Sequence, residues 1–387
     1  MIFPIISTRE YAHEAGTMQI DAHYYALLAF LRACGFKKPS ALKVAYASQY
    51  VDDAKLNHVV IEGDPNTITH DTVEGKACFF NMATCHSYTM IKTINYTSMV
   101  HNTCAFHFVP GCKGANFVKR MRCRTDSPVI RAILEDAMAG TDLIKLGIAL
   151  HAYADSYSHH GFSGLISKVN DIRDCRAIYG MPADWKDTLT RGVKFFIRDK
   201  LDAVLDMTIP AYGHGQALDY PDIPSVVWSY EYDYSDEFSD SYIFSGMIDN
   251  RKRFAEAFQA IRGYLERFLA KHRSHRDRSV PTRDFATLFE TLVHEAPRHQ
   301  RIEDWRELIL NHRLFDHHDE FSYDEHAWPR SAFENYREDW DDDFTVEGAR
   351  LSQAFSGSAW YAFYLAVKWY KRRFFQYCSH CGLDIPR

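Results

Sequence analysis

The chain has 387 residues, 46% hydrophobic and 25% charged, a composition typical of globular proteins that excludes extensive disorder. Its formal net charge of −6 provides no global basic field for nucleic acid or an anionic membrane. No run reaches about 18 apolar residues, so we expect no transmembrane helix. The nine cysteines have irregular spacing, which argues against a disulfide framework and predicts reduced thiols and a cytoplasmic protein.

The first third of the chain predicts two helices followed by irregular structure. We expect residues 1–17 to be an N-terminal extension, with Met18 as the functional start. The apolar pattern of residues 18–35 predicts a helix that stops at Gly35. Residues 41–53 predict a second helix, and residues 71–125 predict irregular structure with room for a short strand or hairpin.

Helical patterns dominate the rest of the chain. Asp126-Ser127-Pro128 has the capping residue and proline of a helix start, and Thr141 is the expected cap of the next helix, residues 142–159. Further helices are predicted at residues 184–207, 247–272, 282–296, 301–313 and 345–376, with loops at 210–246 and 314–344. We therefore predict an all-α fold, a multi-helix bundle with long irregular loops. Its expected parts are a metal-binding helical domain at 18–272 and a C-terminal helical region at 273–387 packed on the same core.

The clearest chemical motif is His151-x-x-x-Asp155-x-x-x-His159. Residues four apart lie one turn apart on the same face of an α-helix. The preceding residues 143–150 are apolar enough to be buried, and a buried helix does not tolerate three ionisable groups without partners. A metal cation is the simplest common partner for two imidazoles and a carboxylate. A hydrogen-bonded polar network is the alternative.

Two acidic segments near the N-terminus are further candidates for metal ligands. Asp21 and His23 can converge on one ion at a fraying helix start, although an N-cap with a surface histidine also fits the pattern. Asp52 and Asp53 end an apolar helix, where the helix dipole disfavours negative charge and a cation would remove the penalty. A polar loop start is the alternative for this pair.

Two histidines in unusual surroundings complete the candidate set. His107 lies between two phenylalanines, and a buried neutral histidine is a good zinc ligand. A core histidine bonded to a backbone carbonyl is equally consistent. His214 lies between two glycines that permit close backbone approach, in a segment that continues to Asp219-Tyr-Pro-Asp222. A flexible loop is the alternative.

Three other patterns are weaker. Cys378 and Cys381 form a single CxxC pair with no second pair nearby, so a frayed terminus is favoured over a zinc site. The acidic residues around 316–326 are interpreted as a solvated loop. The chain contains no P-loop, GxGxxG or GxSxG motif, which leaves serine hydrolases, kinases and nucleotide dehydrogenases without support.

The HxxxD helix motif resembles that of zinc-dependent phospholipase C and the related fungal single-strand nucleases, which are all-helical and hold three zinc ions. The set as a whole is similar to a bacterial family of unknown function over roughly residues 18–270, through segments at 21–25, 48–53, 106–111 and 213–224. The resemblance implies the fold and a ligand set in the order Asp21 and His23, Asp52 or Asp53, His107, the helix motif, then His214. The secreted enzymes use an N-terminal amine and a second HxxxD/E pair that have no match here, so we expect one to three Zn²⁺ or other divalent ions.

These observations predict a metal-dependent hydrolase of phosphoesters, with Asp52 or Asp53 as ligand or general base. The expected substrate is a small molecule or a lipid headgroup; nucleic acid has no support from the net charge. Tyr24, Tyr153 and Tyr157 are candidates for orienting substrate. Three alternatives stay open: a non-catalytic protein with a structural metal site, an HD-type phosphohydrolase using His70-Asp71, and a membrane-surface lipase.

Overall fold

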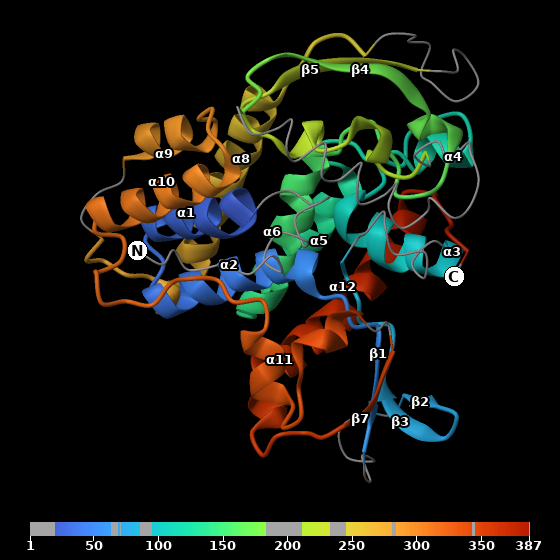
Figure 1. The fold of residues 1–387 in the computed structure, drawn as a ribbon, viewed down its shortest axis with the longest axis vertical. Helices are drawn as coiled ribbons and strands as arrows, with labels where there is room; N and C mark the ends of the chain where they lie inside the picture. Colours follow the sequence, from blue (N-terminus) through green and yellow to red (C-terminus); the bar gives the residue numbers. More distant parts are fainter. Residues whose placement is uncertain are drawn as a thin grey trace, which may run out of the picture.

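The computed structural model describes residues 20–62, 69, 71–85, 95–182, 211–232, 245–280, 284–342 and 345–386. Helices form the middle of the molecule, and two small sheets lie at opposite ends of its long axis (Figure 1). The predicted N-terminal extension, residues 1–17, and the predicted helix at 184–207 lie outside the described residues. None of the helices within the described ranges is both long and apolar enough to cross a membrane.

The helices account for most of the described residues. Two of them, η1 and η3, are π-helices, and short 3-10 turns occur at η4 (Lys168–Asn170), η5 (Gly215–Ala217), η6 (Tyr220–Asp222), η7 (Arg273–His275), η8 (Glu338–Asp342) and η9 (Phe355–Gly357). The π- and α-helices are η1 (Asp21–Ala26), α1 (Leu27–Cys34), α2 (Lys38–Asp53), α3 (Tyr96–Ser98), η3 (Met99–His107), α4 (Phe117–Arg120), α5 (Pro128–Ala139), α6 (Leu143–Ser158), α8 (Asn250–Lys271), α9 (Phe285–Leu292), α10 (Arg298–Asn311), α11 (Ala327–Ala332) and α12 (Ala359–His380).

The two sheets make the fold mixed α/β, so the all-α prediction is wrong. A four-stranded sheet has the order β2-β3-β1-β7 and a three-stranded sheet the order β4-β5-β6. The strands are β1 (His58–Ile61), β2 (Thr72–Val73), β3 (Lys76–Phe79), β4 (Ile172–Tyr179), β5 (Val227–Tyr232), β6 (Ile248–Asp249) and β7 (Thr345–Ala349). The strands β1 and β7 pair in parallel, with Val59 opposite Val346. A partner so distant along the chain leaves no local sequence pattern, which is why β1 and β7 are not predicted. The short hairpin expected within residues 71–125 is present, as the antiparallel pair β2 and β3.

Several helix ends follow the local chemistry of the sequence. The predicted stop at Gly35 is confirmed, since this glycine ends α1 with a φ of 100°. The predicted start at residues 126–128 is also confirmed, because the Ser127 side chain accepts a hydrogen bond from the Ile130 amide and Pro128 begins α5. The predicted Thr141 cap is wrong by one residue: Asp142 caps α6 by accepting from the amides of Ile144 and Lys145.

Several larger segments differ from their predictions. The segment 314–344, predicted as loop, contains α11, and the segment 71–125, predicted as irregular, contains η3. The segment 210–246, predicted as loop, contains β5. The predicted helix at 345–376 is divided, because its first residues form β7 and the helix α12 begins only at Ala359, after Ser358 caps it.

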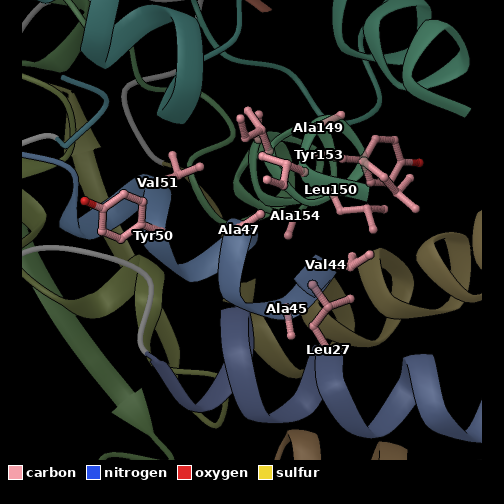
Figure 2. Close-up of a cluster of buried hydrophobic side chains, with 14 of the residues drawn as sticks. Leu27, Val44, Ala45, Ala47, Tyr50, Val51, Ala149, Leu150, Tyr153 and Ala154 are labelled. Atoms are coloured by element: carbon pink, nitrogen blue, oxygen red, sulfur yellow. The ribbon is translucent and has the colours of Figure 1, made fainter. Parts of the chain in front are cut away.

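The helix α6 lies at the centre of the helical layer and packs against α2. A Cβ atom at Gly147 of α6 would lie 2.4 Å from the Val44 carbonyl oxygen and 2.7 Å from the Ala47 Cβ of α2, so only glycine permits this approach. Figure 2 shows small and branched side chains of this part of the core, among them Val44 and Ala47 of α2 and Leu150 and Ala154 of α6. This close contact lies one turn before His151 on α6 and one turn before Asp52 on α2.

One large hydrophobic core contains side chains from both predicted regions, 18–272 and 273–387. It includes Leu28 of α1, Ile148 of α6 and Trp360 of α12, all fully buried. A smaller cluster surrounds Trp228 of β5. The division of the chain at residue 272 stays a prediction.

Candidate metal centre

The last turns of α6 carry a buried carboxylate, Asp155, that is surrounded by histidines. Its Oδ1 atom lies 3.0 Å from His23 Nε2. Its Oδ2 atom lies 3.0 Å from His107 Nδ1 and 3.3 Å from His151 Nε2. The helical spacing of four residues therefore does bring His151 and Asp155 together. The packing of η3 against α6 supplies His107, and η1, which packs against α2, supplies His23.

A second carboxylate, Asp52, faces the same histidines from the end of α2. Its Oδ1 atom lies 3.6 Å from His151 Nε2 and 3.7 Å from His107 Nδ1. The close approach of α2 and α6 at Gly147 places this carboxylate here, since both helices continue from that contact toward the cluster. The residues Asp52, His107 and His151 form one group able to hold a metal ion, and His23, His151 and Asp155 form another.

A third group consists of His159, His214 and Asp222. His159 Nε2 lies 3.1 Å from Asp222 Oδ1, and His214 Nε2 lies 3.3 Å from Asp222 Oδ2. Asp222 lies in the segment that follows His214, but the sequence pattern does not predict its carboxylate as a ligand. Asn250, fully buried at the start of α8, donates from its side-chain amide to the carbonyls of Tyr220, Pro221 and Ile223. Asn250 thereby fixes the turn that presents Asp222.

Hydrogen bonds to backbone carbonyls define which nitrogen of three histidines carries a proton. His107 donates from Nε2 to the Thr84 carbonyl at 2.9 Å, and His159 donates from Nδ1 to the His107 carbonyl at 2.8 Å. His214 donates from Nδ1 to the Leu218 carbonyl at 2.8 Å. A carbonyl only accepts, so in each neutral imidazole the other nitrogen presents its lone pair to a carboxylate oxygen. Two lone pairs face each other stably only with a cation or a second ring proton between them.

The spacing of the donor atoms matches a metal site. Zinc bonds to imidazole nitrogen and carboxylate oxygen are about 2.0–2.1 Å long, so two ligand atoms of a tetrahedral site lie about 3.3 Å apart. The nitrogen–oxygen distances within the three groups run from 3.0 Å for His23–Asp155 to 3.7 Å for His107–Asp52. His159 Nδ1, at 3.7 Å from Asp155 Oδ2, already donates to a carbonyl, so its Nε2 is the available ligand atom.

Three buried polar atoms at this centre have no hydrogen-bond partner within the described part of the chain. They are Asp52 Oδ1, His151 Nδ1 and Asp222 Oδ2. A buried polar atom left unsatisfied costs about 1–3 kcal/mol. Two of the three are carboxylate oxygens at ligand distance from imidazole nitrogens, so a divalent cation would satisfy them directly. The donor set fits a metal centre on this observation.

The ionisation of the metal-free groups is strongly perturbed, and in opposite directions. Burial and the nearby Asp155 raise the pKa of Asp52 well above its usual value. Burial also acts to raise the pKa of Asp155, but the histidines His159, His151 and His23 hold it well below its usual value. Burial and the nearby His23 lower the pKa of His151 to about 3. The pKa of His159 is about 9, because the carboxylates of Asp155 and Asp222 outweigh the effect of burial.

The ligand atoms that the three groups share limit how many metal ions the centre can hold. His151 Nε2 belongs to two groups, and a single nitrogen lone pair binds one ion. Asp155 has one oxygen toward His23 and the other toward His107, so its carboxylate can bridge two ions. His159, His214 and Asp222 make a group that needs no shared ligand.

Comparison with known proteins identifies a family but no function. Residues 18–378 match the model of a family of unknown function (DUF6765). The chain belongs to this family. Searches of curated proteins and of solved structures each find no match. The DUF6765 match covers all eight residues of the three groups, and no comparison supports the resemblance to phospholipase C or the nucleases, which stays a prediction.

Two of the predicted site residues lie outside the three groups. Asp21 receives a hydrogen bond from Arg301 Nε at 2.7 Å, whereas His23, two residues later, points to Asp155. Residues two apart lie on nearly opposite sides of a helix, which explains the divergence. Asp53 accepts hydrogen bonds from the Tyr323 hydroxyl at 2.6 Å and from Gln49 at 3.1 Å, so its contacts differ from those of Asp52.

The tyrosines proposed to orient substrate have partners elsewhere. Tyr24 donates to the Phe321 carbonyl. Tyr153 donates to Asp126, and its hydroxyl also bonds to that of Tyr157. In these contacts the three hydroxyl groups bond to residues outside the three groups able to hold a metal ion.

The weaker sequence patterns also acquire partners in the structure. An exposed group of Asp316, His318 and Asp319 has the Lys38 ammonium bonded to both carboxylates, so a cation is already present there. In the HD pair, His70 lies outside the described residues, and Asp71 accepts from Tyr364 and Lys368.

The prediction of a frayed terminus at the CxxC pair is wrong, because α12 continues to His380 and Cys381 is its C-cap residue. Cys378 is fully buried in the last turns of the helix, and both Cys378 and Cys381 hydrogen-bond to the Cys112 thiol.

Proposed function

We propose that this chain is a metal-dependent hydrolase of phosphoesters, with zinc as the metal. The observation that carries the proposal is the set of imidazole nitrogens that face buried carboxylate oxygens at 3.0–3.3 Å while their opposite nitrogens donate to carbonyls. Histidine and carboxylate are the ligands of catalytic zinc sites, in which carbonyl or carboxylate partners orient the imidazoles.

The proposed ligands fall into two sets. Asp155 belongs to the first set and also lies near His159 of the second set. The first set is His23, Asp52, His107, His151 and Asp155, and the second is His159, His214 and Asp222. Bound divalent cations would supply Lewis-acid stabilisation of the charge that develops on phosphate and lower the pKa of a water molecule. We assign Asp52 the role of ligand or general base, and the lack of a hydrogen-bond partner for its Oδ1 atom among the described residues supports this role.

The substrate class that we propose is a small-molecule or lipid-headgroup phosphoester. A cytoplasmic location is part of the same proposal, because none of the nine cysteines, all within the described ranges, forms a disulfide.

One observation favours a second function, a structural metal centre in a non-catalytic protein. None of the eight ligand residues is more than 3% exposed. Structural zinc sites have a closed ligand sphere, whereas catalytic sites keep one position open for water or substrate.

Hydrolysis of bis(p-nitrophenyl) phosphate and p-nitrophenyl phosphate by the zinc-loaded protein tests the proposal. We expect activity that is lost on chelation, restored by zinc, and absent from Asp155→Asn. A zinc-loaded protein that hydrolyses neither ester, and that unfolds cooperatively when zinc is removed, would instead support the structural centre.

A further inference from the structure

Residues 81–85 lie beside the end of α2, and their backbone hydrogen bonds run in two directions. The first two amides of residues 82–85 bond to Asn57, and the last two bond to the Ala54 carbonyl, at 3.1–3.2 Å. Buried backbone carbonyls need donors as well. For three carbonyls of this segment the donors are side chains of two other elements, α12 and η3.

The Lys371 ammonium of α12 is the donor to two of these carbonyls. Its Nζ atom lies 2.8 Å from the Asn81 carbonyl oxygen and 3.0 Å from the Ala83 carbonyl oxygen. It also lies 3.2 Å from Asn81 Oδ1 and 3.0 Å from Asn102 Oδ1 on η3. All four acceptors are neutral oxygens, so the ammonium holds the backbone of residues 81–83 against η3.

The next residue, Thr84, is fully buried and contacts two of the helices that carry metal ligands. Its carbonyl accepts the hydrogen bond from His107 Nε2 at 2.9 Å. Its hydroxyl donates to the Val51 carbonyl at 2.7 Å, one residue before Asp52. The carbonyl that fixes the His107 tautomer therefore belongs to the segment that Lys371 holds.

The helix α12 also contacts η3 directly beside this ligand. The Tyr370 and Phe106 rings stack with their centroids 4.7 Å apart, and Lys371 Nζ lies 5.7 Å from the centroid of the same Phe106 ring. Lys371 is only 6% exposed, and burying an ammonium costs free energy that its hydrogen bonds must offset. An apolar side chain would fill this space without that cost, so packing alone does not account for a lysine at this position.

We propose that Lys371 is a positioning residue of the metal centre, which holds residues 81–83 so that the Thr84 carbonyl orients His107. The inference rests on the metal binding of the proposed function and adds α12 to the elements that support it. Without the ammonium, two buried carbonyls lose their donor, which is unfavourable. Movement of the segment toward other donors displaces the Thr84 carbonyl. His107 then loses the acceptor that keeps Nε2 protonated and leaves Nδ1 to bind a metal.

The zinc affinity of the full chain, measured by competition with a chromophoric chelator, tests this assignment. Lys371→Met removes the ammonium and keeps the length of the side chain. The matched control is Lys368→Met, the same exchange about one turn earlier on α12, where the ammonium pairs with Asp71 and the side chain is 44% exposed. Thermal unfolding of the metal-free proteins reports whether each variant folds.

Two further variants separate positioning from a general loss of stability. His107→Ala removes the ligand through which Lys371 acts, so it is combined with Lys371→Met in a double-mutant cycle. Thr84→Val keeps the shape of the side chain and removes its bond to Val51. Thr84→Val decides the question alone if Lys371→Met does not fold.

We expect Lys371→Met to lower the zinc affinity at least about tenfold, Thr84→Val to lower it as well, and Lys368→Met to retain the wild-type value. In the His107→Ala background, Lys371→Met should lower the zinc affinity no further. Wild-type affinity in Lys371→Met would overturn the assignment, and so would an undiminished loss in the His107→Ala background. If Lys371→Met is unfolded, wild-type affinity in Thr84→Val would overturn it.

The outcomes also separate this assignment from the hydrolase. Variants that overturn the assignment, in a wild type that binds zinc, leave the hydrolase proposal standing. The expected affinities in a chain that hydrolyses neither phosphoester would support the assignment and contradict the hydrolase.

Discussion

Replacing Gly147 by alanine should damage the metal centre from a distance. The new Cβ atom would lie 2.4 Å from the Val44 carbonyl oxygen, whereas ordinary van der Waals contact begins at 3.4 Å. The helices α2 and α6 must therefore separate by about 1 Å. Asp52 lies on α2, while His151 and Asp155 lie on α6, so the separation pulls the ligands apart.

Two opposing terms set the expected change in the free energy of unfolding. Alanine is favoured over glycine inside a helix by about 1 kcal/mol. Overpacking a close helix contact costs about 1–3 kcal/mol. We expect Gly147→Ala to lower the free energy of unfolding by up to about 2 kcal/mol. We also expect its zinc affinity to fall at least about tenfold, as it does when the partners that orient metal ligands are lost.

Gly263→Ala is the matched control, because Gly263 lies within α8 and a Cβ atom there would meet nothing within 4 Å. This variant should gain about 1 kcal/mol and bind zinc like wild type. The assays are urea unfolding of the metal-free proteins and competition for zinc with a chromophoric chelator. A Gly147→Ala protein that is stabilised like Gly263→Ala and keeps wild-type zinc affinity would refute the link between helix packing and the centre.

Three further predictions concern individual ligands. Asp52→Asn should lower the zinc affinity at least about tenfold. Asp53→Asn should retain the wild-type zinc affinity, because the Asp53 carboxylate faces Tyr323, and equal effects of the two variants in the competition assay would contradict this. Asp222→Asn should lose one equivalent of zinc in elemental analysis and keep the remainder. Although burial opposes it, Asp155 and Asp222 raise the pKa of His159 from 6.5 to about 9 in the metal-free protein. A group whose pKa is higher in the folded than in the unfolded protein stabilises the folded state when it is protonated. For His159 this contribution, up to about 3 kcal/mol, is complete below pH 6.5 and disappears as pH rises through 9. Urea unfolding of chelated protein should show the decline, and a flat profile would exclude it.

The site was more predictable from sequence than the sheets were. The spacing of His151, Asp155 and His159 encodes a common helix face, and the structure does bring the first two into direct contact. His159 instead directs Nε2 to Asp222, because its Nδ1 is held by the His107 carbonyl. Asp222 was not assigned because it lies in a 3-10 turn, where residue spacing does not define a common face.

The neighbouring carboxylates show a different limit of sequence analysis. Asp52 and Asp53 are adjacent in a helix, and successive residues point about 100° apart. Which of the two faces the histidines depends on how α2 is rotated against α6, and Gly147 determines that packing only once both helices are in place. The strand β7 is not predicted from sequence for a similar reason: it depends on pairing with β1, which lies in a distant part of the chain.

Elemental analysis of the purified chain by mass spectrometry, from a preparation never exposed to chelator, tests the metal centre most directly. Wild type should contain at least two zinc ions, or another divalent metal, per chain, and Asp155→Asn should lose most of them while keeping its fold. A wild-type protein that contains no metal, or the same metal content in both proteins, would contradict the account and leave the buried histidines and carboxylates as a polar core.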